Sequence, residues 1–444
     1  MCSKKDPALP SPIEPTACPL AVTDPIPRYH QFGLSVICWF LKLVLDAALP
    51  MRGTVKAMVI LFSESLPQLE APCWQTGRAW LLRVGLFKLQ RPKEQAGDWI
   101  YLLDHTIQLG PDKCLAIVGL RQAHLPDTPR ALRCEDLEPI WIEPVRHSTK
   151  EKVQEQLEQA ARRTGVPRAI VSDGGKDLLG GVQLFSAAHP ETLSVYDIKH
   201  KCALVLKAHL SKDAEWENFT QRAAHLNAQV QQTALAALRP PSQRSKCRYL
   251  NVGVLTRWAA RVGALMEQRP AELTAQIDWE KLDEKFQELG RYKSKVAEWQ
   301  EMMEVTEQVE SFIRTHGLYP GCAPELAQQI RDQLCRPAQR IREELLAHLA
   351  EQSAELREEE RVWGSTEILE SVFGKLKCME QNEGRDGFTS MLLALPALLS
   401  VTAKDVVAKA LETVRTQDVT HWVHAQFGYS MAAVRQKAYA AVQT

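Results

Sequence analysis

Three acidic residues lie where carboxylates could bind metal ions together. Asp104 follows the apolar run WIYLL, and Asp173 follows the shorter run AIVS. Glu370 falls in STEILESVFGKLK, residues 365–377, and shares one helical face with Gly374 and Lys377. Two acids at strand ends and one on a helix can hold a pair of Mg²⁺ ions for an in-line displacement at phosphorus. The pattern therefore suits a phosphodiester substrate, with Lys377 neutralising a phosphate.

Each acid taken alone also has a structural interpretation. Asp173 precedes Gly174 and Gly175, which allow backbone dihedrals that other residues avoid, and an aspartate there commonly forms a turn or caps a helix. On the helix, Glu367 lies on the same face as Glu370 and is an alternative third acid. The metal-site hypothesis therefore depends on the joint placement of the acids. Carboxylate oxygens favour Mg²⁺, for which Mn²⁺ can substitute.

A sheet would have to bring the two aspartates together, and the hydrophobic pattern predicts one. Apolar runs separated by turn residues predict strands, and amphipathic stretches between them predict helices. The strands are expected at 98–104, 113–120, 138–145, 169–171 and 192–197, and the helices at 150–165 and 176–188. This order indicates an α/β fold with a mixed sheet.

Two histidines lie next to these strands. His200 follows the fifth strand, and we expect it to form a hydrogen bond with Asp197 that fixes the junction between strand and helix. His105 follows Asp104 along the first strand, so its side chain should point to the opposite face and not to a metal.

The remaining regions are expected to be helical. Two amphipathic stretches begin at Arg52 and Ala71 and have the size of a helix-turn-helix unit. The apolar run from Phe32 contains two charges and predicts a buried core helix, not a membrane span. Residues 211–362 predict further helices, broken near Pro240-Pro241, Pro270 and Pro320. Residues 1–28 contain several prolines and predict a disordered tail.

The composition is that of a globular protein without strong overall charge. The 444 residues include 54 Lys or Arg and 54 Asp or Glu, so any surface that binds nucleic acid must be locally basic. The 11 cysteines are scattered without a Cys-x-x-Cys pair. That usage argues for reduced thiols in a cytosol and against a disulfide framework or a zinc ribbon. We therefore expect a cytoplasmic protein that does not enter a membrane.

One region has the local basic charge that contacts to a nucleic-acid backbone require. Between Asp197 and Leu265 there are 11 Lys or Arg against four Asp or Glu. Within this region Trp258, flanked by Arg257 and Arg261, could stack on an unpaired base, or it could pack between helices, as such residues more often do. The N-terminal helices add two candidates for phosphate contacts, Arg78 and Arg83.

Taken in order, five segments resemble the motifs of the DDE transposases of bacterial insertion sequences: DWIYLLDHTI, GPDKCLAIVGL, AIVSDGGKDL, YDIKHKCALVLK and TEILESVFGKLK. The resemblance extends over about residues 30–440. It implies a ribonuclease-H-like catalytic core with a mixed sheet, a helical N-terminal DNA-binding region and a large all-α insertion. It also implies that Asp104, Asp173 and Glu370 are the catalytic acids and hold the metal.

The resemblance extends to three further residues. Asp197 and His200 resemble the Asp-x-x-His motif of Mutator-like and hAT-like relatives, and Lys377 stands where several families place a DNA-contacting lysine. One departure is that Trp363 and Thr366 occupy the positions where some insertion-sequence families have a tyrosine and an arginine.

The spacing of the acids agrees with an inserted domain. Asp104 and Asp173 are 69 residues apart, whereas 197 residues separate Asp173 from Glu370. The chain then divides into a tail (1–28), a DNA-binding domain (29–95), the first part of the core (96–210), the insertion (211–362) and a final segment with the glutamate and further helices (363–444).

The implied function is DNA transposition. A transposase of this kind uses Mg²⁺ to cleave DNA at the ends of the transposable element and then joins the freed 3′-hydroxyl to target DNA. The resemblance also implies a homo-oligomer that holds both element ends, associated with the bacterial nucleoid. Two alternatives remain: a catalytically inactive DNA-binding remnant of such an element, and a ribonuclease-H-like nuclease without strand transfer. A purely structural helical protein would leave the order of the motifs unexplained.

Overall fold

The computed structural model describes residues 24–109, 112–126, 128–242, 252–273, 276–382, 390–428 and 438–441. They fall into two compact units, Arg91–Gly374 and Met1–Gln90 with Lys375–Thr444. This division differs from the five expected segments, because the N-terminal and C-terminal helices pack together. Most of the expected tail and the turn at residues 110–111 lie outside the described residues.

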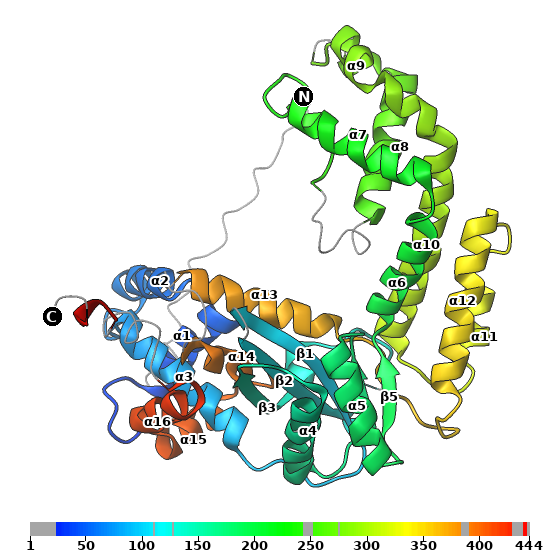
Figure 1. Cartoon of the computed structure of the whole chain (residues 1–444). Helices are drawn as coiled ribbons and strands as arrows, with labels where there is room; N and C mark the ends of the chain where they lie inside the picture. The colour runs from blue at the N-terminus through cyan, green and yellow to red at the C-terminus, as the bar shows by residue number, and fades with distance from the viewer. Residues whose placement is uncertain are drawn as a thin grey trace, which may run out of the picture. The chain divides into compact units, whose positions relative to one another are not determined.

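The unit Arg91–Gly374 contains a mixed sheet of five strands (Figure 1). The strands are β1 (Trp99–Leu109), β2 (Asp112–Arg121), β3 (Glu138–Val145), β4 (Ala169–Ser172) and β5 (Leu193–Tyr196). They lie in the order β3-β2-β1-β4-β5. The pairs β1–β2 and β2–β3 are antiparallel, and β1–β4 and β4–β5 are parallel. The expected α/β class with a mixed sheet is confirmed.

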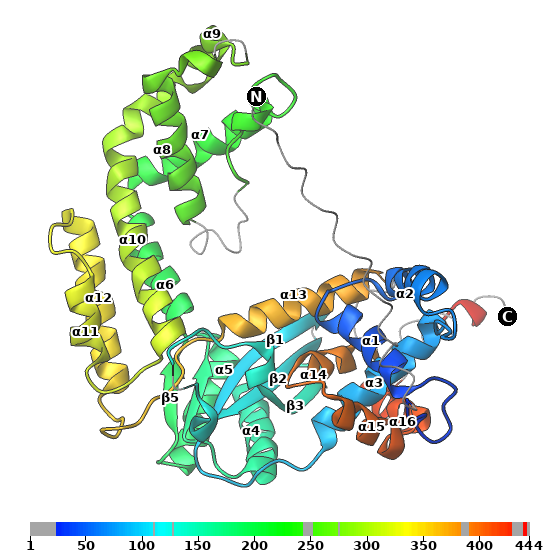
Figure 2. The ribbon, with the colours of Figure 1, turned by 180° about the vertical axis from the view of Figure 1, so that it is seen from behind.

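Helices α4 (Lys150–Thr164) and α5 (Lys176–Ala188) cover one face of this sheet (Figures 1 and 2). Alternate side chains of β1, such as Tyr101 and Leu103, point to this face and are fully buried with residues of both helices. The two helices approach closely because Gly181 has no side chain: an added Cβ would lie 2.5 Å from Val153 Cβ. The side chains of Ile100, Leu102 and Asp104 point to the opposite face.

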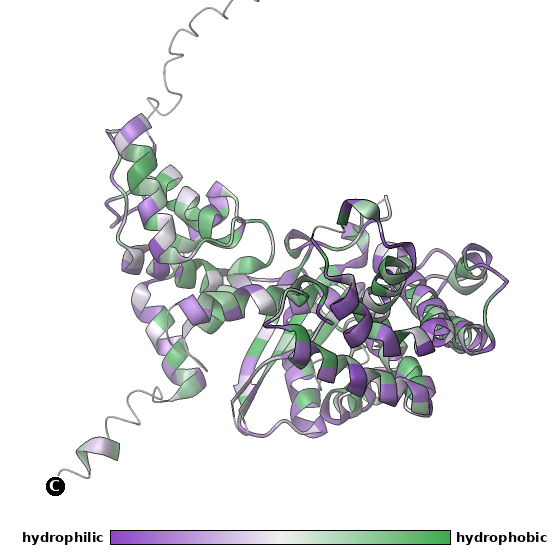
Figure 3. Ribbon diagram, turned by 90° about the horizontal axis from the view of Figure 1, so that it is seen from above, coloured by the Kyte–Doolittle hydropathy of each residue, from purple (hydrophilic) through white to green (hydrophobic). Residues whose placement is uncertain are grey.

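The segment after the sheet is helical, as expected for residues 211–362. It follows α6 (Ile198–Leu210) and contains α7 (Ala214–Val230), α8 (Val252–Gln268), α9 (Trp279–Phe286), α10 (Lys293–His316), α11 (Cys322–Gln329) and α12 (Arg336–Ser353). The breaks fall at the expected prolines. Hydrophobic and hydrophilic residues alternate around these helices (Figure 3). Their apolar faces meet in an aromatic cluster in which Trp299 lies 5.0 Å from Trp216 and 5.1 Å from Phe219 between ring centroids.

Helix α13 (Glu367–Asn382) follows and runs from one unit into the other. The second unit contains α1 (Leu34–Leu45), α2 (Met51–Ser65), α3 (Trp74–Gln90), α14 (Ala394–Leu398), α15 (Lys404–Thr413) and α16 (Thr416–Phe427). Most of α1 is buried, which confirms the expected core helix. In the part of the chain that the structure describes, no helix combines the length and the apolar character needed to span a bilayer.

A buried lysine joins α3 to the chain after α14. Lys88 Nζ donates to the carbonyl oxygens of Ala397 (3.1 Å), Leu399 (2.7 Å) and Ser400 (3.0 Å) and to Thr402 Oγ1 (2.8 Å), and the side chain is completely buried. We expect Lys88→Met to lower the free energy of unfolding by about 3 kcal/mol, because several buried acceptors lose a charged donor.

Urea unfolding followed by circular dichroism would measure this loss. Lys56→Met, at an exposed position of α2, is the matched control and should change the free energy of unfolding by less than about 0.5 kcal/mol. Equal unfolding midpoints for the two variants would contradict the stabilising role of Lys88.

Candidate functional site

Three aspartates lie at one edge of the sheet, just beyond the parallel pairing of β1, β4 and β5. The last paired positions are Leu103 with Ser172 and Ser172 with Tyr196. The next residue on each strand is acidic: Asp104, Asp173 and Asp197. The expectation that the first strand ends at Asp104 is wrong, because β1 continues to Leu109 and Asp104 pairs with Ala116 of β2. Asp104 is instead the first residue of β1 beyond the ladder with β4.

The environment of Asp104 disfavours its ionised form. Burial and the nearby carboxylate of Asp173 raise its pKa from 3.8 to about 7, and Glu370 contributes in the same direction. The His105 N–H, which donates to Asp104 Oδ1 at 2.6 Å, and the side chain of His200 act in the opposite direction. The three acids singled out in the sequence therefore lie within electrostatic reach of one another.

Replacing Asp104 should stabilise the metal-free protein at high pH. The folded chain holds a proton at Asp104 between its unfolded pKa near 3.8 and its folded pKa of about 7, so stability is lost as pH rises through this range. Asp104→Asn removes this ionisation. We expect the variant to match the wild type at pH 4 and to exceed its free energy of unfolding by about 2 kcal/mol at pH 8.5.

The measurement is urea unfolding in EDTA at the two pH values. Asp177→Asn is the control, and it should change the free energy of unfolding in the opposite direction. Burial alone would raise the pKa of Asp177, but hydrogen bonds from Lys113 and Ser148 lower it, so this variant should lose stability at pH 8.5. Equal stability of Asp104→Asn and wild type at pH 8.5 would contradict the raised pKa of Asp104.

Asp173 begins the turn between β4 and α5. Its Oδ1 accepts the Gly175 N–H at 2.9 Å, whereas no described residue donates to Oδ2. Neither Gly174 nor Gly175 has a positive φ, so the expectation of unusual dihedrals is wrong. Gly174 is required for space instead, because an added Cβ would lie 2.0 Å from the Tyr196 hydroxyl. The missing side chain lets Tyr196 pack over the turn beside Asp173.

Asp197 ties this edge of the sheet to the helix that carries Glu370. Its Oδ2 accepts the Thr366 N–H at 2.5 Å and the Thr366 hydroxyl at 2.9 Å. Its Oδ1 accepts the N–H of His200 at 2.8 Å and lies 2.9 Å from His200 Nδ1, so the expected hydrogen bond between the two residues is present. Ser365 Oγ accepts the N–H of Glu367, the first residue of α13, at 3.2 Å. The N-termini of α6 and α13 are thus bound together.

These contacts determine the charge of the Asp197–His200 pair. Burial alone would raise the pKa of Asp197, but the hydrogen bonds from His200 and Thr366 lower it. The hydrogen bond with Asp197 raises the pKa of His200, and the carboxylates of Asp173 and Asp104 add to this effect. The pair therefore places a protonation-prone imidazole beside the strand-end acids.

Glu370 and Glu367, the two candidates for the third acid, differ in their contacts. Lys199 Nζ lies 2.7 Å from Glu370 Oε2 and 3.7 Å from Glu367 Oε1. Glu367 is also bound by Arg314 of α10 at 3.3 Å. Glu370 is among the groups that raise the pKa of Asp104, so its carboxylate lies within electrostatic reach of Asp104. Sequence reasoning missed Lys199, although its position in DIKHK beside the expected motif was visible.

A second group of side chains lies on the α5 side of the sheet. His105 Nε2 is 3.2 Å from Ser148 Oγ and 3.7 Å from Asp177 Oδ2, and Lys113 Nζ is 2.9 Å from the same oxygen. His105 thus points away from Asp104, as expected. Asp177 is a further residue that sequence reasoning missed. Asp177 could have been identified from the sequence as an acid in the first turn of the expected helix.

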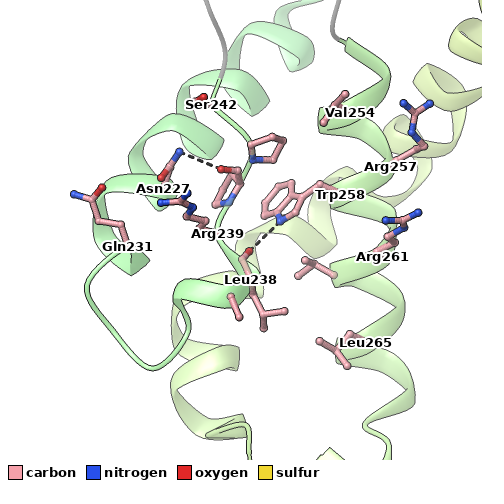
Figure 4. A pocket seen from close by; sticks show the side chains of 14 residues that line it. Asn227, Gln231, Leu238, Arg239, Ser242, Val254, Arg257, Trp258, Arg261 and Leu265 are labelled. Atoms are coloured by element: carbon pink, nitrogen blue, oxygen red, sulfur yellow. Dashed lines mark hydrogen bonds between the residues drawn. The ribbon is translucent and has the colours of Figure 1, made fainter. Parts of the chain in front are cut away.

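Trp258 lies beside a cavity of about 850 Å³ between α7 and α8 (Figure 4). Its Nε1 donates to the Leu238 carbonyl at 2.9 Å, and its half-buried ring lines the cavity. The adjacent Arg257 forms an ion pair with Glu307 of α10, and Arg261 is exposed at the cavity wall. Trp258 therefore packs within the helical segment, and its ring is also accessible to a ligand in the cavity. Residues 243–251 of the expected basic stretch lie outside the described residues.

The two N-terminal arginines have partners inside their own unit. Arg83 Nε donates to the Val414 carbonyl at 2.6 Å, and burial lowers the pKa of its guanidinium. Arg78 Nη2 donates to Ser390 Oγ at 2.6 Å. These contacts join α3 to the C-terminal segments, a structural role that differs from the phosphate contacts expected from the sequence. Lys377, in contrast, is exposed on α13.

The acids have the right chemistry for a hard cation, although their oxygens do not converge. In the described ranges, no three His, Cys, Asp or Glu side chains are gathered closely enough to hold a metal ion. The donors are nevertheless all carboxylates, the oxygen ligands that Mg²⁺ prefers, and burial together with the nearby carboxylate of Asp173 raises the pKa of Asp104. Glu370 is paired with Lys199 in this structure.

Comparisons with known proteins give no assignment. No protein-family model matches the chain, and no curated protein is similar to it at a significant level. The functional argument therefore depends on the fold and on the side chains described above.

Proposed function

We propose that the chain is a DDE transposase with a ribonuclease-H-like catalytic core. The observation that carries the proposal is the edge of the sheet: Asp104 and Asp173 lie directly beyond the parallel pairing of β1 with β4, and Asp197 binds the helix that carries Glu370 to the same edge. The five-stranded mixed sheet and the long helical segment before the glutamate agree with such a core and its insertion.

The three acids would hold Mg²⁺, or Mn²⁺ in its place. Bound there, the metal would supply Lewis-acid charge for the attacking and leaving oxygens. Asp104, Asp173 and Glu370 position it, and the sheet edge fixes the direction of attack. The same site then serves two phosphoryl transfers, hydrolysis at the element end and attack of the freed 3′-hydroxyl on target DNA.

The DNA contacts belong to the same proposal. Lys377, exposed on α13, would bind a backbone phosphate. Arg261 and Arg257 would do the same beside the cavity at Trp258, whose ring is available for stacking on a base. Joining two element ends in concert calls for a homo-oligomer on DNA, and we place it with the nucleoid in a bacterial cytoplasm.

The test is strand cleavage and joining on DNA that carries the sequences flanking the coding region. The wild type should cleave and join in Mg²⁺ or Mn²⁺ but not in EDTA, and Asp173→Ala should bind the DNA without cleaving it. Glu280→Ala, at an exposed position of α9, is the control and should retain activity. Cleavage without joining would indicate a nuclease, and binding without cleavage by the wild type would indicate a DNA-binding remnant.

A further inference from the structure

Lys199 lies among three glutamates. Its ammonium group is 2.7 Å from Glu370 and 3.7 Å from Glu367, and Glu310 of α10 also acts on it electrostatically. Arg314 adds one further cation, paired with Glu367. Only 19% of the Lys199 side chain is exposed, so this position is an enclosed one for a flexible lysine.

The backbone fixes where Lys199 can reach. Asp197, two residues earlier, holds the first turn of α13 through Thr366, and the Ile198 N–H donates to the Gly364 carbonyl at 3.0 Å. These bonds place the first turn of α6 against the start of α13. Lys199 therefore faces the same glutamate that the strand-end acids require for a metal site.

We propose that Lys199 is a built-in counter-cation for Glu370, which holds this carboxylate in the metal-free protein and, once the carboxylate is released, binds a DNA phosphate beside the site. The proposal rests on the proposed function, because it takes Glu370 as the third metal ligand. It makes Lys199 a positioning residue for Glu370 and adds a DNA contact to the α6 side of the site.

The ion pair between Lys199 and Glu370 suits an exchange of the lysine for a divalent cation. Glu370 has 42% of its side chain exposed, and ion pairs at such positions are weak enough for a divalent cation to replace the lysine. Once released from Glu370, the Lys199 ammonium group would bind a phosphate that approaches the site, since an ammonium group on a flexible stem binds phosphate as a point charge.

Metal binding without DNA gives the first test. Mn²⁺ titrations followed by electron paramagnetic resonance should show Lys199→Met binding Mn²⁺ about two- to fivefold more tightly than the wild type, because the competing cation is gone. Lys199→Arg keeps a cation and should resemble the wild type. Lys201→Met, which removes a lysine 4.0 Å from Glu344 on the same helix, is the matched control. Unchanged or weaker Mn²⁺ binding by Lys199→Met would overturn the proposal.

DNA binding gives the second test. With Ca²⁺ present, Lys199→Met should bind element-end DNA several-fold more weakly than wild type and lose about one unit of salt dependence. In EDTA the two proteins should bind equally, because Lys199 is then occupied by Glu370. If Lys199→Met weakened DNA binding equally with and without Ca²⁺, the proposed exchange of Lys199 for a cation at Glu370 would be wrong. Absence of DNA cleavage by the wild type would overturn the transposase proposal alone, since the Mn²⁺ titrations still decide the role of Lys199.

Discussion

Glu370→Gln should lower the rate of metal-dependent DNA cleavage on the order of 10³-fold, because a metal ligand contributes several kcal/mol to stabilising the transition state. Glutamine keeps the size of the side chain but not its charge. Glu367→Gln should lower the rate less than about tenfold, since Glu367 is bound by both Arg314 and Lys199.

Single-turnover cleavage of element-end DNA in Mn²⁺ would measure both rates. DNA binding in Ca²⁺, followed by gel mobility, shows whether each variant remains folded and bound. The two glutamates are three residues apart on one helix, so each variant is the control for the other. An inactive Glu367→Gln beside an active Glu370→Gln would make Glu367 the third acid.

Asp197→Ala should lower the free energy of unfolding by about 3–5 kcal/mol, because a buried carboxylate that accepts hydrogen bonds from Thr366 and His200 is lost. It should also abolish cleavage by releasing the start of α13. Asp278→Ala removes another N-terminal cap, an exposed one that accepts the Lys281 N–H at 3.1 Å, and should lower the free energy of unfolding much less. Urea unfolding followed by tryptophan fluorescence measures both.

The effect of Asp197→Ala should depend on pH. The stability due to the raised pKa of His200 is fully present below its unfolded value of 6.5 and is lost as pH rises through the folded pKa. The stability due to the lowered pKa of Asp197 is present above 3.8 and is lost as pH falls through the folded pKa. The cost of Asp197→Ala should therefore be larger at pH 6 than at pH 9. A cost independent of pH would show that the charges of the pair contribute little.

The local elements could be predicted because their signals are local. The apolar run within 138–145 and the amphipathic repeat of 150–165 give β3 and α4 with almost the observed bounds. The hydrogen bond between Asp197 and His200 joins residues three apart at a helix start, so it too follows from the chain itself.

Other properties of the site depend on partners distant in the sequence. The ion pair of Lys199 with Glu370 spans 171 residues, and the contact of Arg83 with Val414 spans 331. Gly174 illustrates the same limit: its type was visible, but the Tyr196 hydroxyl that requires it comes from another strand. The positions of these partners depend on how the helices and strands pack.

The sequence by itself therefore determined the order of strands and helices and the acids at the sheet edge, because periodicity and strand ends are properties of neighbouring residues. Only the tertiary structure decided that Asp104 lies inside β1, that Arg83 donates to a distant backbone carbonyl, and that Asp173 and Glu370 raise the pKa of Asp104. Burial and charge determine these outcomes, and both depend on which distant segments the folded chain brings together.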